Sequence, residues 1–303
     1  MDFRAELRAL LEQVPRGRVA RLQDLAGALG DVRATAAVAR FLRDEPLPGG
    51  DRVVTEVGHP VLGRHGRVPE RARGTPASFP PVFSAFAGPA PLAKLRREQA
   101  RLAAKVSRRN GFRTVRTVAG VDLAYEDGQG FVALVVLRVS DLAVVEEVLV
   151  SRKVDFPYIP TYLAYRELPL VEAAFRRLGE PPTVLLIDGH GQLHPRRCGI
   201  ACMAGVKLGV PTIGVAKSPL VGTPDRRPKT GEAVPVRCEG EILGYALRPT
   251  ASIRPLYVST GHQVSPRSAV RVVHGLCLRR IPEPLRLADA RAAQWKEDKE
   301  KRL

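Results

Sequence analysis

Two short apolar runs, each ending in an aspartate, constrain this chain more than any other feature. The first, at residues 120–122, reads GVD, and the second, at residues 186–188, reads LID. Continuous apolar runs are typical of strands covered on both faces of a sheet. If the two strands are neighbours, Asp122 and Asp188 project from one edge of that sheet. Carboxylates together with water and phosphate suit Mg²⁺, so the pair indicates a metal site, although either acid alone would be weak evidence.

The segments around these aspartates have the periodicity of alternating helices and strands. Three strands come first, and helices and strands then alternate. This order predicts an α/β fold with an RNase-H-like mixed sheet. The expected strands are residues 117–124, 131–139, 143–150, 184–188 and 212–216, and the expected helices are residues 161–178 and 196–208.

A stretch rich in Pro, Ala and Gly, residues 76–91, predicts a linker between two unequal domains. Before it, apolar spacing predicts helices over residues 2–13, 22–29 and 34–43, followed by a strand at 53–54 and a hairpin at 58–68. Three short helices and a small β-wing predict a winged-helix domain. The expected domains are therefore a winged helix over residues 1–75, the linker over 76–91 and the larger α/β domain over 92–303.

The positive charge is concentrated after the linker. The chain has a net charge of +17, with 13 Lys/Arg against 10 Asp/Glu in residues 1–90 and 35 against 21 in the rest. Such a balance favours a polyanionic partner such as nucleic acid, although a cationic membrane-surface protein would look similar. The densest stretch, residues 91–117, would coat several faces of a helix and contact phosphates, or would form a solvated helix.

The sequence shows no apolar leader and no run of the roughly 18 apolar residues that a membrane span needs. Four cysteines are present, and Cys198 and Cys202 lie four apart on an expected helix. That spacing could form a ligand pair, but buried reduced thiols are the favoured interpretation. We expect a cytoplasmic monomer that does not bind membranes.

Six blocks of the second part of the chain carry chemistry-bearing residues. In chain order they are VAGVDLAY (118–125), DFPYIP (155–160), YRE (165–167), DGHGQLHPRR (188–197), IGVAKS (213–218) and VSTGH (258–262). In this order they resemble the endonuclease V family, which cleaves nucleic acid at deoxyinosine. The resemblance extends over residues 113–293, and DGHG with HPRR and FPYIP with a following RE are its most specific strings.

The resemblance implies a role for each residue of the acidic centre. Asp122 and Asp188 would hold Mg²⁺, for which Mn²⁺ could substitute, with Glu167 as a third carboxylate and metal ligand. Lys217 would neutralise charge at the scissile phosphate. His262 would contribute to the hydration of the metal or to activation of the attacking water.

The resemblance also implies two substrate-binding loops. The proline-stiffened loop after Phe156 would be the strand-separating wedge, with Tyr158 filling the gap left by a displaced base. Gly189 and Gly191 would let backbone groups approach the extruded hypoxanthine. The implied substrate-binding residues are Pro157, Tyr158, Ile159, Pro160, Gly189, His190, Gly191 and His194.

Several neighbouring residues are open to two interpretations. His190 and His194 could form an i,i+4 metal pair, but we expect them to contact substrate from a loop. Tyr125 and Tyr165 could be ordinary packing aromatics, and Asp155 and Arg196 could be structural hydrogen-bond partners. Asp289 could reach the acidic site.

The N-terminal part resembles the DNA-binding domain of alkylguanine-DNA alkyltransferases. The resemblance rests on residues 14–19, 24–26 and 58–63, the last of which read GHPVLG. Gly58 stands where that family has its acceptor cysteine, so alkyl transfer is excluded. The family's base-displacing arginine and helix tyrosine fall on Ala36 and Leu22. We expect an alkyltransferase-like remnant that assists DNA or lesion binding, or else a scaffold or protein-contact module.

The sequence as a whole predicts a DNA-repair endonuclease with metal-ion catalysis. It would cut the second phosphodiester bond 3′ to deoxyinosine and leave 3′-hydroxyl and 5′-phosphate ends, in DNA that could also carry other deaminated or alkylated bases. Two alternatives stay open: an inosine-specific ribonuclease, and a non-catalytic protein that binds inosine.

Overall fold

The computed structural model describes the chain except residues 46, 56–60, 62–79, 252–253 and 301–303. It divides into two compact units: Met1–Glu98 together with Asp155–Pro160, and Gln99–Val154 together with Thr161–Leu303. We refer to them as the first and second units. No helix of the described residues has both the length and the apolarity to cross a bilayer.

The first unit is built on three helices and a two-stranded sheet. Helix α1 buries Phe3, Leu7 and Leu10 at helical spacing, and Asp2 caps it by accepting a hydrogen bond from the Ala5 amide at 3.0 Å. Strands β1 and β2 pair in parallel. The elements are α1 (Phe3–Glu12), β1 (Ala20–Arg21), α2 (Leu22–Ala28), η1 (Val32–Ala34), α3 (Thr35–Asp44), η2 (Gly50–Arg52) and β2 (Val53–Val54).

These bounds confirm the three predicted helices and the short strand. The predicted hairpin at 58–68 and five residues of the GHPVLG block lie outside the described residues, so the winged helix stays a prediction. The described part of the expected linker bonds to the first unit: Phe83 N–H donates to Val19 O at 2.7 Å, and Gln13 Nε2 donates to Ala87 O at 2.7 Å. The first unit therefore extends beyond the predicted boundary, to Glu98.

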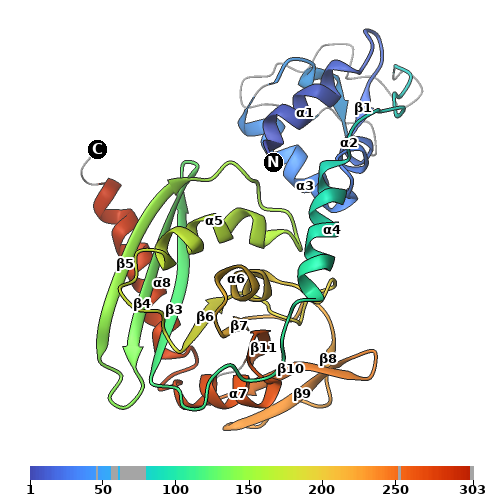
Figure 1. Cartoon of the computed structure of the whole chain (residues 1–303). Helices are drawn as coiled ribbons and strands as arrows, with labels where there is room; N and C mark the ends of the chain where they lie inside the picture. The colour runs from blue at the N-terminus through green and yellow to red at the C-terminus, as the bar shows by residue number, and fades with distance from the viewer. Residues whose placement is uncertain (46, 56–60, 62–79, 252–253, 301–303) are drawn as a thin grey trace. The chain divides into compact units, whose positions relative to one another are not determined.

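The second unit is organised around one nine-stranded mixed sheet of order β5-β4-β3-β6-β7-β11-β10-β9-β8 (Figure 1). Strands β3, β4 and β5 form an antiparallel meander, and β6 and β7 run parallel to β3. The outer strands are antiparallel again. The strands are β3 (Thr117–Glu126), β4 (Gln129–Arg138), β5 (Val144–Lys153), β6 (Val184–Asp188), β7 (Thr212–Ala216), β8 (Thr223–Pro224), β9 (Glu232–Cys238), β10 (Glu241–Arg248) and β11 (Leu256–His262).

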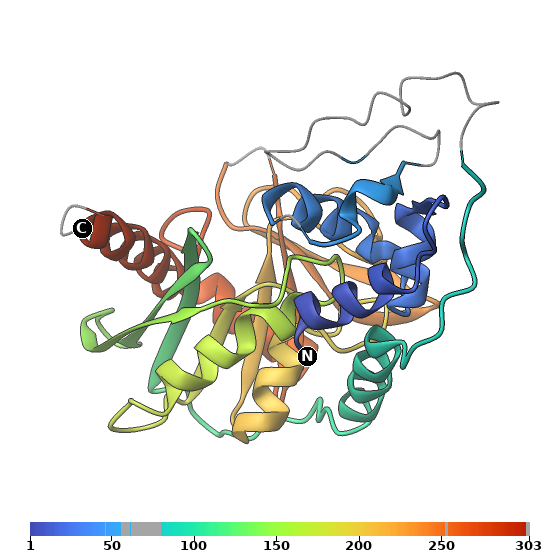
Figure 2. The same cartoon turned by 90° about the horizontal axis from the view of Figure 1, so that it is seen from above.

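Helices cover both faces of this sheet. On one face, α5 (Leu163–Phe175) and α6 (Ile200–Leu208) lie side by side (Figures 1 and 2). The other face is covered by α7 (Pro266–Gly275) and by α8 (Glu283–Glu300), which packs on β3 and β4. Helix α4 (Pro91–Ala103) precedes the sheet in sequence.

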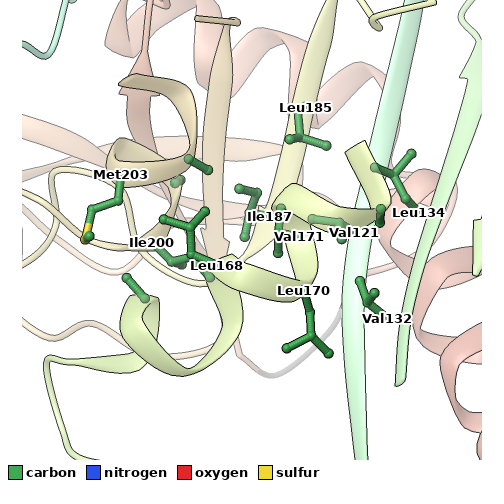
Figure 3. Close-up of a cluster of buried hydrophobic side chains, with 14 of the residues drawn as sticks. Val121, Val132, Leu134, Leu168, Leu170, Val171, Leu185, Ile187, Ile200 and Met203 are labelled. Atoms are coloured by element: carbon green, nitrogen blue, oxygen red, sulfur yellow. The ribbon is translucent and has the colours of Figure 1, made fainter. Parts of the chain in front are cut away.

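The period of two along each strand assigns its side chains to one core or the other. The core under α5 and α6 takes Val121 from β3 and Ile187 from β6, and Figure 3 shows these side chains facing Leu168 of α5. The core under α7 and α8 takes Val118 of β3 together with Leu285 of α8. The two runs that end in aspartate are therefore buried on both faces, as their composition predicts.

The predicted element order of the second unit, three strands followed by alternating helix and strand, is confirmed. Two details were wrong. The helix predicted over 196–208 begins only at Ile200, so Arg196 and Cys198 lie in a loop. The basic stretch 91–117 is helical only to Ala103. Strands β8 to β11 and helices α7 and α8 were not predicted.

Candidate functional site: an acidic centre on the sheet

Asp122 and Asp188 lie side by side on adjacent parallel strands. Val121 pairs with Ile187, and the aspartate is the next residue on each strand. Neighbouring strands are about 4.8 Å apart, so the two carboxylates share one position on the sheet. Because Val121 and Ile187 face α5 and α6, both aspartates point to the opposite face, on which α8 packs.

Lys217 follows β7 and lies on the same face. Ile213 and Val215 of β7 belong to the core under α7 and α8, and the period of two continues to Lys217. Its Nζ donates to Asp188 Oδ2 at 2.7 Å. The ammonium therefore supplies positive charge directly beside the aspartate pair.

Asp289 of α8 is a further carboxylate of this site. It follows Leu285 by one helical turn, and Leu285 packs into the core on that face. The negative charge of Asp289 acts on both Asp122 and Lys217. The sequence left open whether Asp289 reaches the site, and the structure places it there.

Glu167 approaches from the other face of the sheet. It is buried on α5, and its Oε1 accepts a hydrogen bond from the Tyr125 hydroxyl at 2.9 Å. The Arg166 guanidinium lies over the Tyr125 ring, 4.2 Å from its centroid. The charge of Asp188 acts on Glu167 as well, so Tyr125 positions a catalytic candidate and does more than fill space.

The pKa values of the site residues are shifted because several carboxylates lie close together and are buried. Burial, and then the charge of Asp188, raise the pKa of Asp122 to about 8, against the hydrogen bond from the Leu123 amide. Burial raises the pKa of Glu167 to about 7. Burial lowers the pKa of Lys217, but its bond to Asp188 and the charges around it outweigh this and raise the pKa overall. The negative charge of the site therefore exceeds its positive charge.

The donor set fits a hard divalent cation. The four carboxylates of Asp122, Asp188, Glu167 and Asp289 offer oxygen atoms alone, and Lys217 is the cation beside them. Among the residues that the structure describes, no three His, Cys, Asp or Glu side chains form a closed cage for a metal. Mg²⁺ binds through one or two carboxylates and keeps several waters, so Asp122 and Asp188 are the residues that fit it.

The loop after Asp188 is held by close backbone packing. A Cβ on Gly191 would lie 2.0 Å from Thr260 O, and a Cβ on Gly214 would lie 2.4 Å from Gly191 N. Gly189 adopts a φ of +149°, which side chains disfavour. The fold itself thus requires Gly189 and Gly191, a reason that the sequence could not reveal. Their contact with an extruded base stays a prediction.

The two histidines of this loop have different surroundings. His190 lies near Asp188, and its Nε2 is 2.8 Å from Ser218 O; burial lowers its pKa. His194 is buried, with Nε2 3.1 Å from Thr161 O and Nδ1 accepting from the Arg196 amide at 3.2 Å. His190 can therefore serve the site, whereas the geometry of His194 is structural and does not support the predicted substrate contact.

Arg196 extends that structural network. Its guanidinium donates to Thr161 Oγ1 at 2.8 Å and to Gln99 Oε1 at 2.6 Å, and it stacks over Tyr162 at 4.5 Å from the ring centroid. Arg196 is thus a structural hydrogen-bond partner, as one of the two interpretations had it. Tyr165 contacts the Tyr162 ring.

The structure does not bring His262 to the acidic centre. Strand β11 runs antiparallel to β7, and its last residue His262 pairs with Thr212, the first residue of β7. Asp188 instead pairs with Val215 near the end of β7. His262 therefore lies toward the opposite edge of the sheet, where its Nδ1 accepts from the Ser107 amide at 3.2 Å.

The predicted wedge lies in the first unit. Tyr158 is 59% exposed, whereas Ile159 is fully buried. Pro160 is exposed and Pro157 is partly exposed. The exposed ring of Tyr158 lies between two prolines and next to the buried Ile159, which is compatible with the wedge role. That role stays a prediction.

The family model for endonuclease V matches residues 100–290, the part of the chain that carries the acidic centre. The chain belongs to the endonuclease V family. It is therefore a nuclease, and endonuclease V enzymes depend on a metal ion, in agreement with the oxygen-rich donor set described above.

Relatives in this family are similar over nearly their whole length. Endonuclease V of Roseiflexus castenholzii is 44% identical over 208 residues, which are 68% of this chain and 94% of that protein. The crystal structure of human ENDOV is 35% identical with a TM-score of 0.64, covering 69% of this chain and 99% of that one. Endonuclease V of Ciona intestinalis, solved with a 24mer DNA containing an inosine followed by a ribo-adenosine, is 28% identical with a TM-score of 0.63, covering 68% of this chain and 98% of that one.

The raised pKa values predict how the stability of the metal-free enzyme depends on pH. Unfolding returns Asp122 and Glu167 to ordinary pKa values near 4. The folded protein thus binds protons that the unfolded chain has released, and their contribution to stability is full below pH 4 and is lost as pH rises through about 7 for Glu167 and about 8 for Asp122.

In EDTA, the melting temperature of wild type should therefore fall more between pH 5 and pH 8.5 than that of Asp122→Asn, by roughly 3 °C or more. Added Mg²⁺ should raise the wild-type melting temperature more at pH 8.5 than at pH 5, because protonated carboxylates do not bind it. Differential scanning fluorimetry measures both. Equal pH dependence in the two proteins would contradict the assigned burial and charge.

Two substitutions test whether Asp289, and not His262, belongs to the acidic centre. Asp289→Asn should lower the rate of strand cleavage by about 10-fold or more, because it removes a charge next to Asp122. His262→Gln, which keeps a side chain able to accept from Ser107, should stay within roughly threefold of wild type. Single-turnover cleavage measures both. The opposite ranking would restore the sequence-based assignment.

Proposed function

We propose that this enzyme is a DNA-repair endonuclease that hydrolyses the second phosphodiester bond 3′ to deoxyinosine and leaves 3′-hydroxyl and 5′-phosphate ends. The observation that carries the proposal is the pairing of Asp122 with Asp188 on one face of the sheet beside Lys217. The Ciona relative, whose crystal contains inosine DNA, supports the choice of lesion.

Mg²⁺ held by Asp122 and Asp188, with Mn²⁺ as a substitute, would supply Lewis-acid charge to the scissile phosphate. Lys217 Nζ lies beside Asp188 and would offset the charge that develops on the phosphate oxygens. Glu167, fixed by the Tyr125 hydroxyl, is oriented to hold a water by its free carboxylate oxygen and to take its proton. Asp289 completes the negative field that retains the cation.

The substrate-recognition part of the proposal concerns the two loops. His190 beside Asp188, with Gly189 and Gly191, would receive the hypoxanthine base next to the scissile bond. Tyr158 and its flanking residues Pro157, Ile159 and Pro160 would fill the space that the base leaves. In this scheme the rigid backbone of the glycine loop gives the pocket its shape before any base enters.

The experiment compares 40-bp duplexes that differ only in deoxyinosine or adenine at one position, each with a labelled strand. The deoxyinosine strand should be nicked one nucleotide 3′ of the lesion in Mg²⁺ and stay intact in EDTA. Extension by a polymerase would establish the 3′-hydroxyl, and phosphatase treatment the 5′-phosphate. Equal cutting of both duplexes would remove the lesion specificity from the proposal.

A second candidate is an inosine-specific ribonuclease. The DNA in the Ciona crystal carries a ribo-adenosine directly after the inosine, so a 2′-hydroxyl at that place is accepted by that relative. Comparing kcat/KM on matched strands with deoxyinosine, with inosine followed by one ribonucleotide, and with all-RNA inosine separates the two. A preference of 10-fold or more for RNA would favour the ribonuclease.

For the N-terminal unit we propose assistance in DNA or lesion binding without alkyl transfer. The human structure is matched over 99% of its length by 69% of this chain, so a nuclease without this unit is a feasible protein. Deleting residues 1–90 and measuring nicking of inosine, uracil and alkylguanine substrates tests the role. A selective loss on alkylguanine would mark a lesion reader, whereas an unchanged profile would mark a scaffold.

A further inference from the structure

Two long segments of the second unit contain no acidic residue. Residues 99–121 and residues 242–282 lack Asp and Glu entirely, while each contains six Lys or Arg. In a chain with 31 acidic residues, two such segments are a local departure from the mixed charge of an ordinary surface. Their consequence depends on whether the fold brings them together.

Hydrogen bonds join the two segments. Asn110 Oδ1 accepts from the Ser265 amide at 2.8 Å, and its Nδ2 donates to Ser268 Oγ at 2.9 Å. The Gly111 amide donates to Gln263 O at 2.9 Å. Figure 1 shows the stretch between α4 and β3 running beside α7. The first segment is therefore fixed along the N-terminal end of α7.

Five arginines of these segments form what we call the basic edge surface. All five are exposed, and within the described part of the chain their guanidinium groups make no ion pair or hydrogen bond. Other arginines of the unit are neutralised, as Arg226 is by Glu232 at 2.7 Å and Arg237 is by Asp225 at 3.1 Å. The surface consists of Arg109, Arg113, Arg116, Arg267 and Arg271.

This surface lies away from the carboxylates. Arg116 directly precedes β3, and Val118 of β3 pairs with Val184, the first residue of β6. Gln263 follows the end of β11, which is at the start of β7. Arg116 and the N-terminal end of α7 thus lie at the edge where the parallel strands begin. Val118 and Asp122 are four positions apart on β3, about 13 Å along the strand.

We propose that the basic edge surface binds the phosphate backbone of a second nucleic-acid segment, distinct from the segment at the acidic centre. Guanidinium groups without carboxylate partners are free to make bidentate contacts with phosphate. Phosphate contacts of this kind do not depend on base sequence. The enzyme would thereby hold flanking or neighbouring nucleic acid while its site acts on one lesion.

The test measures binding of a labelled, undamaged 20-bp duplex by fluorescence anisotropy over a range of salt concentrations in EDTA. The double variant Arg113→Gln/Arg271→Gln should bind about 10-fold more weakly than wild type at 50 mM salt. Its salt slope should be smaller by about 2, one for each lost phosphate contact. The matched control Arg226→Gln/Arg237→Gln removes the same charge from ion-paired sites and should change neither value by more than about twofold.

Equal weakening in the two double variants would overturn the proposal, since net charge alone would then explain the binding. A large drop of the single-turnover rate on a short deoxyinosine strand in Arg113→Gln/Arg271→Gln would also overturn it, because the arginines would then serve the acidic centre. The expected rate is that of wild type. Failure of every form to cut deoxyinosine would reject the proposed lesion and leave the duplex-binding result standing.

Discussion

Replacing Asp122 with asparagine should reduce the rate of strand cleavage by about 10³-fold or more, with the fold intact. The change removes one of two charged oxygen donors that lie side by side on β3 and β6. Asparagine keeps the size of the side chain and an oxygen that can accept the hydrogen bond from the Leu123 amide. In the wild-type protein that amide nitrogen is 2.8 Å from Asp122 Oδ1. A site that uses a bound cation to stabilise the charge developing on the phosphate loses most of its rate enhancement when the cation is no longer held.

The measurement is single-turnover nicking of a deoxyinosine duplex at saturating enzyme in Mg²⁺. Asp127→Asn is the matched control, because the same chemical change is made at an exposed residue in the turn that follows β3. That variant should cut at the wild-type rate. Raising Mg²⁺ should restore Asp122→Asn only in part, since Asp188 remains. Nicking within 10-fold of wild type by Asp122→Asn would reject the metal-site assignment itself.

The aspartate pair could be predicted from the sequence because each member is fixed by a local pattern. The apolar spacing places each aspartate on a buried strand, whichever sheet that strand joins. Asp188 ends β6, whereas β3 continues past Asp122 to Glu126. The pattern did not show which strands are neighbours in the sheet. The register that pairs Val121 with Ile187 is a long-range contact, and it is this register that places Asp122 beside Asp188.

Residues beyond the local patterns could not be placed in that way. His262 ends an apolar strand just as Asp188 does, yet β11 runs antiparallel to β7 and ends at the other edge. Strand direction is a property of the topology and is not encoded in five residues. Asp289 lies on α8, and only the packing of Leu285 onto the sheet determines which helical face reaches the site.

The role of a glycine in close packing likewise could not be predicted from the sequence. Gly120, two residues before Asp122 on β3, has no room for a Cβ, which would lie 2.2 Å from the carbonyl of Pro284 at the start of α8. The sequence offers Gly120 as part of an apolar run, whereas its function is to let a helix lie on the strand. The close approach of α8 to β3 is also what allows Asp289 to act on Asp122.

The second large effect is expected at Lys217. Lys217→Met should lower the single-turnover rate by about 10²-fold and leave KM nearly unchanged, because the lost charge matters most when negative charge develops on the phosphate. The ammonium nitrogen is 2.7 Å from Asp188 Oδ2. Its removal also leaves the four carboxylates of the site without a neighbouring lysine. Methionine keeps the apolar stem of the side chain up to the ε position and removes the ammonium group.

Lys217→Arg separates position from charge in the same assay. A guanidinium retains the charge but spreads it over a planar group, so an ammonium acting as a compact point charge would be replaced only in part. We expect Lys217→Arg to fall between wild type and Lys217→Met, with Lys229→Met, at an exposed position before β9, as an unaffected control. If Lys217→Met kept more than about a third of the wild-type rate, the bond to Asp188 would be a structural ion pair, and the charge compensation at the phosphate would have to come from the bound cation alone.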